Sequence, residues 1–167
     1  MKKIWILIIL SFVLCGCSVQ ETFETVNDTV LQPQQVLAKQ MILTLPEDAA
    51  VPAMESDMTG QLYLCDDYFI TVQTALSGDL NATIKETTGF DRDMLSVIET
   101  TQGQIHRYEC VWVAAGEEEQ QVGRMAILDD GNYHYVVTVM ADASKSGDLT
   151  DSWNQLLSSF SLADTAP

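Results

Sequence analysis

Hydrophobic and polar residues alternate along much of the chain after residue 39, as they do in half-buried β-strands. The segments with this pattern are 40–45, 61–65, 68–76, 94–100, 105–115, 121–129 and 133–141. Two acidic residues separate the second segment from the third, which predicts a hairpin. The last three segments are joined by the short, turn-forming links GEEEQ and DGN, so they predict an antiparallel meander.

Two other segments have helical spacing. Asp79 is suited to cap a helix with Leu80 and Ile84 on one face, and Gly89 is suited to end it. Near the C-terminus, Asp148 or Thr150 is expected to cap a second helix. Its apolar face consists of Leu149, Trp153, Leu156, Leu157 and Phe160. Burial of such a face is the main source of helix stability, so this helix is expected to lie on the sheet.

The predicted strand 105–115 carries polar and apolar side chains on each of its two faces. One set is His106, Tyr108, Cys110 and Trp112, and the other is Arg107, Glu109, Val111 and Val113. Both sets become apolar toward the end of the strand. This pattern predicts a central strand that is covered on both faces at that end.

The first residues have the pattern of an export signal. Two lysines precede an uncharged apolar run at 4–14. This run is too short to span a bilayer, because a helix needs about 20 apolar residues to cross the hydrocarbon core. We therefore interpret it as a signal peptide and not as a transmembrane anchor.

The end of this signal resembles the bacterial lipobox, in which an aliphatic residue and two small residues precede a cysteine that is lipidated. Leu14, Cys15, Gly16 and Cys17 fit this pattern with Cys17 as the acylated residue. The alternative is an ordinary cleaved signal with a chance cysteine. The resemblance implies removal of 1–16, palmitate-type acylation at Cys17 and membrane attachment on the extracytoplasmic side. Residues 17–37 are then a polar tether, and 38–163 a single domain.

The charge of the chain excludes one class of partner. The formal net charge is −16, and the predicted signal contributes two lysines and no acid. The mature protein is therefore still more acidic, and it lacks the basic surface that nucleic acids require. Nucleic-acid binding is excluded.

The order of predicted elements resembles that of a known family. An early LTLP segment (43–46), a strand pair, a helix, a meander, and a last helix with Trp153 and a closing Ser159, Phe160 and Leu162 are similar to the PsbP-like fold. This family is named for an accessory subunit of the photosynthetic oxygen-evolving complex and includes small bacterial lipoproteins. The resemblance implies an α+β fold, with an antiparallel β-sheet and helices packed on it, and a non-enzymatic accessory or binding role.

Catalytic and cofactor motifs are missing from the sequence. It has no G-x-S-x-G elbow, no Walker loop and no H-E-x-x-H motif, so an enzyme is not expected. The two histidines, His106 and His134, are candidates for a metal site with Asp129 or Glu109. Surface or packing roles are the more common use of isolated histidines, and we expect no metal or other cofactor.

Two further groups of residues have alternative interpretations. Asp129, Asp130 and Asn132 offer oxygen ligands for calcium, but turn formation explains them better because no EF-hand spacing is present. Four aromatic residues are candidates for a ligand pocket, with core packing as the favoured alternative. They are Tyr108, Trp112, Tyr133 and Tyr135.

Cys65 and Cys110 both fall on predicted strands of an exported domain. A disulfide between them and two free buried thiols are both left open, since the sequence does not give their separation.

The sequence as a whole predicts a lipid-anchored extracytoplasmic lipoprotein of the cell envelope with a non-catalytic binding or accessory role. Its expected contacts are the membrane through the lipid, and an envelope protein or small ligand. The alternatives are a structural or assembly factor that acts through protein contacts and, more remotely, a hydrolase.

Overall fold

The computed structural model describes residues 36–51, 60–116 and 119–163. The predicted signal, Cys17 and most of the tether lie outside these residues and stay predictions. The elements are β1 (Met41–Ile42), β2 (Gly60–Leu64), β3 (Phe69–Leu76), α2 (Leu80–Thr88), the 3-10 helix η2 (Arg92–Met94), β4 (Ile98–Gln102), β5 (Ile105–Ala115), β6 (Gln120–Asp129), β7 (Tyr133–Asp142), α3 (Thr150–Ser159) and β8 (Ser161–Leu162). In the described part of the chain, none of the helices has the length and apolar character needed to cross a membrane.

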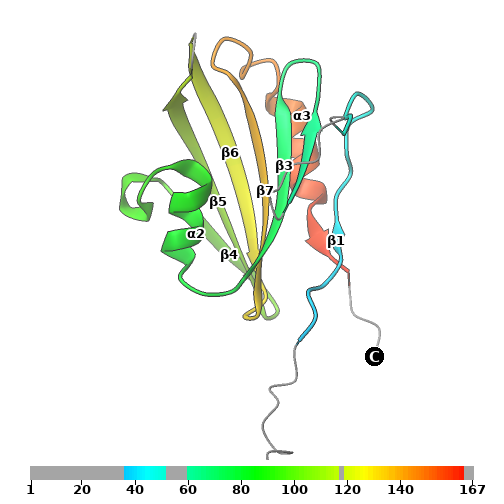
Figure 1. The fold of residues 1–167 in the computed structure, drawn as a ribbon, viewed down its shortest axis with the longest axis vertical. Coiled ribbons are helices and arrows are strands. Elements are labelled where there is room, and N and C mark those ends of the chain that lie inside the picture. The colour runs from blue at the N-terminus through cyan, green and yellow to red at the C-terminus, as the bar shows by residue number, and fades with distance from the viewer. Residues whose placement is uncertain (1–35, 52–59, 117–118, 164–167) are drawn as a thin grey trace, which may run out of the picture. The chain divides into compact units, whose positions relative to one another are not determined.

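Strands β2 to β7 form one antiparallel sheet with the order β2-β3-β7-β6-β5-β4 (Figure 1). The predicted hairpin β2–β3 and the predicted meander β5–β6–β7 are both confirmed. The remaining strand pair, β1 with β8, brings the two ends of the described domain together.

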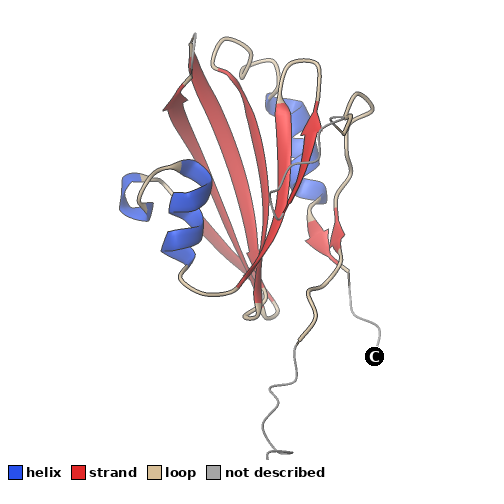
Figure 2. Cartoon of the chain, viewed as in Figure 1, coloured by secondary structure: helices blue, strands red, loops and turns tan. Residues whose placement is uncertain are grey.

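Helices cover the two faces of the sheet (Figure 2). Helix α3 and the β1–β8 pair pack on one face, and α2 packs on the other. The cluster on the α3 face includes Tyr68, Ile70, Ala126, Leu128, Tyr135, Val137, Val139, Trp153, Leu156, Leu157 and Phe160. The cluster on the α2 face includes Ile84, Tyr108, Cys110, Trp112, Met125, Ile127 and Val136. The predicted α+β class, an antiparallel sheet with helices packed on it, is therefore confirmed.

The helix predictions are confirmed except for one cap. Asp79 accepts a hydrogen bond from the backbone N–H of Asn81, and Gly89 ends α2 with a φ of 80°. In α3, Leu149 occupies the N-cap position and no side chain caps the helix, so the prediction of Asp148 or Thr150 was wrong. The Thr150 hydroxyl instead donates to the carbonyl of Ser146.

Strand β5 differs from its prediction as a strand covered on both faces. Its even-numbered residues Tyr108, Cys110 and Trp112 are buried beneath α2. On the opposite face, Val111 is 53% exposed and Val113 is 49% exposed. Helix α3 packs on strands nearer the middle of the sheet, and it leaves this part of β5 uncovered.

Two predicted strands are shorter or shifted in the structure. The apolar alternation at 40–45 yields only the two-residue strand β1, because its partner β8 is equally short. The segment predicted at 94–100 begins in η2, and β4 starts only at Ile98. The two-residue turn at Gly103, which has a φ of 65°, sets the register of β4 on β5.

Cys65 and Cys110 are both free, so the disulfide that the sequence left open is not formed. Cys65 packs against the cluster on the α3 face, whereas Cys110 belongs to the cluster on the α2 face. Cys65 follows β2 directly, and three strands separate β2 from β5. At about 4.8 Å per strand this is roughly 19 Å, well beyond the ~7 Å limit for a bridge.

Candidate functional site

The four aromatic residues proposed as a pocket do not share one. Tyr108 and Trp112 lie in the cluster under α2, whereas Tyr133 and Tyr135 lie on the α3 face. Gly123 stands opposite Trp112 on β6, and a Cβ atom there would collide with the indole ring. The ligand-pocket prediction for these residues was therefore wrong, and core packing is their main role.

Tyr133 and Tyr135 also hold the start of the domain in place. The Tyr133 hydroxyl donates to the carbonyl of Val36 over 2.8 Å. The Tyr135 hydroxyl accepts from the backbone N–H of Lys39 and donates to Asp130. The Lys39 ammonium lies 3.6 Å from the same carboxylate. Residues 36–39 are therefore fixed to the start of β7.

Asp130 illustrates why the DGN segment is a turn. Its carboxylate accepts from the backbone N–H groups of Asn132 and Tyr133, and Gly131 has a φ of 85°. Burial opposes ionisation of Asp130, but these N–H groups, the Tyr135 hydroxyl and the nearby lysine outweigh it and hold its pKa below the usual value. Turn chemistry thus accounts for the residues that also suggested calcium.

The two histidines are separated by one strand. His106 on β5 and His134 on β7 are each paired in register with Asp129 on β6. His106 lies in a partly exposed site beside Glu99 and Thr101, 3.3 Å from each side chain. His134 is buried. Among the described residues, no three His, Cys, Asp or Glu side chains are placed to share a metal ion.

His134 belongs to a polar network that the sequence did not predict. Its Nδ1 lies 2.8 Å from the Thr83 hydroxyl of α2, and its Nε2 lies 3.4 Å from the Ser77 hydroxyl. Ser77 in turn donates to Asp129 over 3.2 Å. Both ring nitrogens of His134 thus have a hydroxyl partner. The network ties α2 to the sheet.

This set of Ser77, His134 and Asp129 does not have the geometry of a hydrolase triad. In such a triad the carboxylate orients the imidazole nitrogen opposite to the one that faces the serine. Here Asp129 approaches the same Nε2 that faces Ser77, at 3.7 Å, and a threonine occupies the other nitrogen. His134 is only 1% exposed, so a substrate has no access to it.

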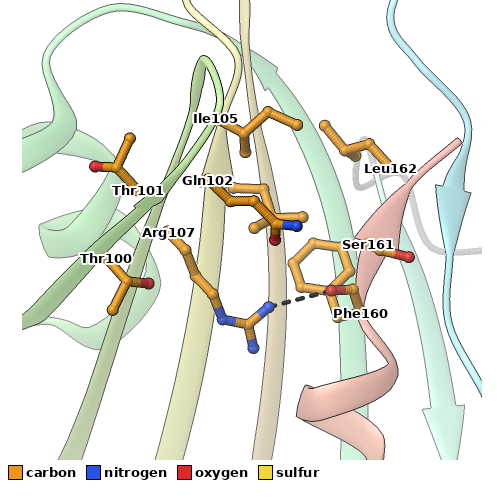
Figure 3. Close-up of a pocket in the computed structure, with 9 residues that line it drawn as sticks. Thr100, Thr101, Gln102, Ile105, Arg107, Phe160, Ser161 and Leu162 are labelled. Atoms are coloured by element: carbon orange, nitrogen blue, oxygen red, sulfur yellow. Dashed lines mark hydrogen bonds between the residues drawn. The ribbon is translucent and has the colours of Figure 1, made fainter. Parts of the chain in front are cut away.

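A candidate binding cavity lies on the α3 face, between the β4–β5 hairpin and the end of α3 (Figure 3). Its volume is about 630 Å³. Its walls are Thr100, Thr101, Gln102, Ile105, Arg107, Leu128, Phe160, Ser161 and Leu162. Ile105, Leu128, Phe160 and Leu162 supply apolar surface, while the threonines, Gln102 and Ser161 supply polar groups. Cavities of this size and mixed lining are typical of ligand sites.

Arg107 joins the two walls of this cavity. Its guanidinium donates to the carbonyl of Phe160 over 3.1 Å (Figure 3). It also donates to the carbonyl of Leu157 over 2.6 Å, and it pairs with Glu109. These carbonyls are at the C-terminal end of α3, where a positive charge is favourable. These contacts engage all three guanidinium nitrogens, so Arg107 positions the end of the helix against β5.

A smaller opening of about 260 Å³ lies on the same side of the sheet. It is lined by Ser96, Ile98, Glu109, Cys110, Val111, Arg124 and Met125. Together the two openings occupy a part of the α3 face that α3 itself leaves uncovered. We call this surface the open half-face; it consists of Ile98, Thr100, Gln102, Ile105, Arg107, Glu109, Val111 and Val113.

The open half-face was not predicted from the sequence. Thr101 and Gln102 continue β4 beyond the predicted strand 94–100, because they have no apolar alternation that would have extended the prediction. Arg107 was recognised only as one member of an alternating strand. The useful signal was Val111 and Val113, whose apolar side chains were expected to be covered and are half exposed instead.

Comparison with known proteins shows similarity in fold but not in sequence. No protein-family model matches the chain, and no curated protein matches it. The structure is similar to that of Saccharomyces cerevisiae Mog1p, described as a Ran-binding protein, with a TM-score of 0.53 and 12% identity over 75% of this chain and 91% of Mog1p. A Bacteroides thetaiotaomicron structure gives a TM-score of 0.51 at 12% identity, over 75% of this chain and 46% of that one.

A third similar structure is LpqN of Mycobacterium tuberculosis, described as involved in cell envelope biogenesis. Its TM-score is 0.48 at 12% identity, over 75% of this chain and 84% of LpqN. At these identities, the Mog1p and Bacteroides similarities establish a shared α+β fold and carry no residue roles.

Proposed function

We propose that this protein is a lipid-anchored, extracytoplasmic accessory protein of the cell envelope that binds a partner or ligand without catalysing a reaction. The observation that carries the binding role is the open half-face, where a mixed polar and apolar cavity adjoins half-exposed valines. Helix α3 covers only part of this sheet face. The uncovered part exposes apolar side chains beside a cavity, and such surfaces are typical of binding sites.

The non-catalytic part of the proposal is supported by the geometry of the titratable groups. The buried histidine is used to hold α2, and the arginine in the cavity is used to hold α3. The hydrolase alternative would need a serine, histidine and carboxylate in a reachable cleft, and Ser77, His134 and Asp129 have neither the order nor the access.

The fold is compatible with this role. Mog1p, whose description names a protein partner, has the same kind of sheet with helices. The finer assignment to the PsbP-like family remains part of the proposal and is supported by the order of elements from β1 to α3. Since one fold hosts many functions, the open half-face and not the fold is the basis of the binding role.

The anchor is proposed at Cys17. Acyl chains on this residue would hold the protein at the membrane, and the acidic, tethered domain would remain beside it. The domain would therefore work close to the membrane surface.

Anchoring is tested by radiolabelled palmitate and membrane fractionation of cells that express the full chain. We expect Cys17→Ala to lose the label and either leave the membrane fraction or accumulate as precursor. Cys15→Ala is the matched control and should behave as the wild type. Normal labelling and fractionation of the Cys17 variant would contradict the anchor.

Binding through the open half-face is tested in the same cells by a photoreactive benzoylphenylalanine in place of Ile98, which is 66% exposed on that surface. The control carries the same group at Glu86, which is exposed on α2 at the other face of the sheet. We expect an adduct of discrete mass from position 98 only. Equal adducts at both positions, or none at position 98, would contradict the proposed function.

A further inference from the structure

Strand β5 is longer than the strand beside it at the edge of the sheet. Strand β4 pairs with β5 from Ile105 to Glu109, whereas β6 continues along β5 to Ala115 (Figure 1). In the described ranges, no strand pairs with the outer side of β5 beyond Glu109. This segment of β5 is therefore an open sheet edge.

The register shows which backbone groups point outward at this edge. The β5–β6 turn is closed by a hydrogen bond from the N–H of Gly116 to the carbonyl of Glu119. In an antiparallel ladder such bonded pairs recur at every second residue, so Trp112 and Ala114 bond to β6. The N–H and C=O groups of Val111 and Val113 consequently face away from β6, toward the open edge.

The side chains at this edge do not protect it. Natural sheet edges are usually blocked by charges, proline, bulges or covering segments. Residues 111–115 read VWVAA and contain no charge and no proline. Val111 and Val113 are half exposed, and Ile98 beside them is 66% exposed. The opening of about 260 Å³ lies between Ser96, Ile98, Val111 and Arg124.

We infer that β5 binds an extended segment of a partner protein, which adds as a strand along residues 111–115 in line with β4. This inference rests on the proposed binding role and names its partner class. The outward N–H and C=O groups of Val111 and Val113 are spaced to bond with an extended backbone that runs beside them. This spacing favours a β-strand over a helix or a small molecule as the partner. The exposed valines select a segment with apolar residues at alternate positions.

The charge of the protein argues for a different chain as the occupant. A second copy would bring its own formal charge of −16 to the same edge. Repulsion between two such chains opposes self-pairing. A neutral or basic segment of another protein meets no such opposition.

Proline substitutions test the free backbone groups directly. Val113→Pro removes an N–H that the fold does not use, so we expect the melting temperature to stay near that of the wild type. The matched Ala114→Pro variant removes an N–H bonded to β6, and its melting temperature should fall by roughly 10 °C or more. Equal losses in both variants would overturn the assignment of an open edge.

Strand addition is tested with a defined probe, the acetylated and amidated octapeptide KTVTVTVK, added to the purified lipidated protein in detergent. Hydrogen exchange should be fast at the Val111 and Val113 amides without the peptide and slow with it. Affinity should fall about tenfold in Val113→Pro, since the N–H of residue 113 that would bond to the added strand is missing. A peptide N-methylated at alternate residues should not bind.

The outcomes separate this inference from the proposed function. If the peptide leaves the exchange of both amides unchanged, or binds Val113→Pro as well as the wild type, strand addition is wrong. If the adduct from position 98 nevertheless forms in cells, the binding role survives and its mode is different. If size-exclusion chromatography shows a dimer that Val113→Pro converts to a monomer, the occupant is a second copy and the proposal of a separate partner is refuted.

Discussion

Replacing Trp153 by alanine should unfold or strongly destabilise the domain. The indole is 2% exposed and lies in the cluster between α3 and the sheet, edge-to-face with Tyr68 at a centroid distance of 6.2 Å. Removing a buried tryptophan side chain costs about 3 to 5 kcal/mol, because transferred surface is lost and a cavity remains. Domains of this size have a total stability of roughly 5 to 15 kcal/mol.

The assay is urea and thermal unfolding followed by circular dichroism. For a domain of this length, a loss of 3 to 5 kcal/mol corresponds to a fall in melting temperature of roughly 10 to 20 °C. Ser158→Ala is the matched control on the exposed side of α3 and should change stability by less than about 0.5 kcal/mol.

A second substitution at the same position tests the contribution of the indole N–H. The indole N–H of Trp153 is buried and has no hydrogen-bond partner in the described residues. Trp153→Phe removes this unpaired donor and keeps most of the apolar volume, so its cost should be about 1 kcal/mol or less. A wild-type melting temperature for Trp153→Ala would refute the core role of this face and make α3 the leading protein-binding surface.

Three further predictions concern other parts of the structure. Without reductant, both Cys65 and Cys110 should be alkylated after unfolding, and in the folded protein Cys110 should react more slowly than after unfolding because burial raises its pKa to about 11. A protein mass two hydrogens lower, with neither cysteine alkylated, would contradict this prediction. Asp130→Asn should lower the free energy of unfolding at neutral pH, and its difference from the wild type should shrink as the pH falls below about 4, because a carboxyl with a lowered folded-state pKa contributes stability only while it is ionised. A difference in unfolding free energy that does not change with pH in urea titrations would contradict this prediction. Thr83→Val should cost about 1 to 3 kcal/mol by leaving the buried histidine nitrogen without its donor, whereas Thr87→Val on the same helix should cost less; equal costs would show that the network does not hold α2.

Local features of the fold were accessible from the sequence because their causes are local. The cap at Asp79 and the left-handed end at Gly89 depend on residues within one helix. The links in the β5–β6–β7 meander are short, so neighbouring strands were constrained to pair. The buried face of α3 followed from a spacing of three and four residues, with Trp153 at its centre.

The faces on which side chains lie were decided by register between strands. Tyr108 and Tyr135 both occupy inward positions of an alternating strand, yet they lie on opposite faces of the sheet. A shift of one residue in the pairing would reverse either assignment, and periodicity within one strand does not fix that shift. The predicted aromatic pocket failed for this reason.

The order of strands was decided only by tertiary structure. The pairing of β3 with β7 joins segments more than fifty residues apart, and it places three strands between β2 and β5. This order separates Cys65 from Cys110. The sequence by itself determined most of the elements, the two caps of α2 and the candidate lipid site at Cys17. The cavity beside Arg107 and the open edge at Val113 arise from where α3 and β4 end against their neighbours, which depends on contacts between distant parts of the chain.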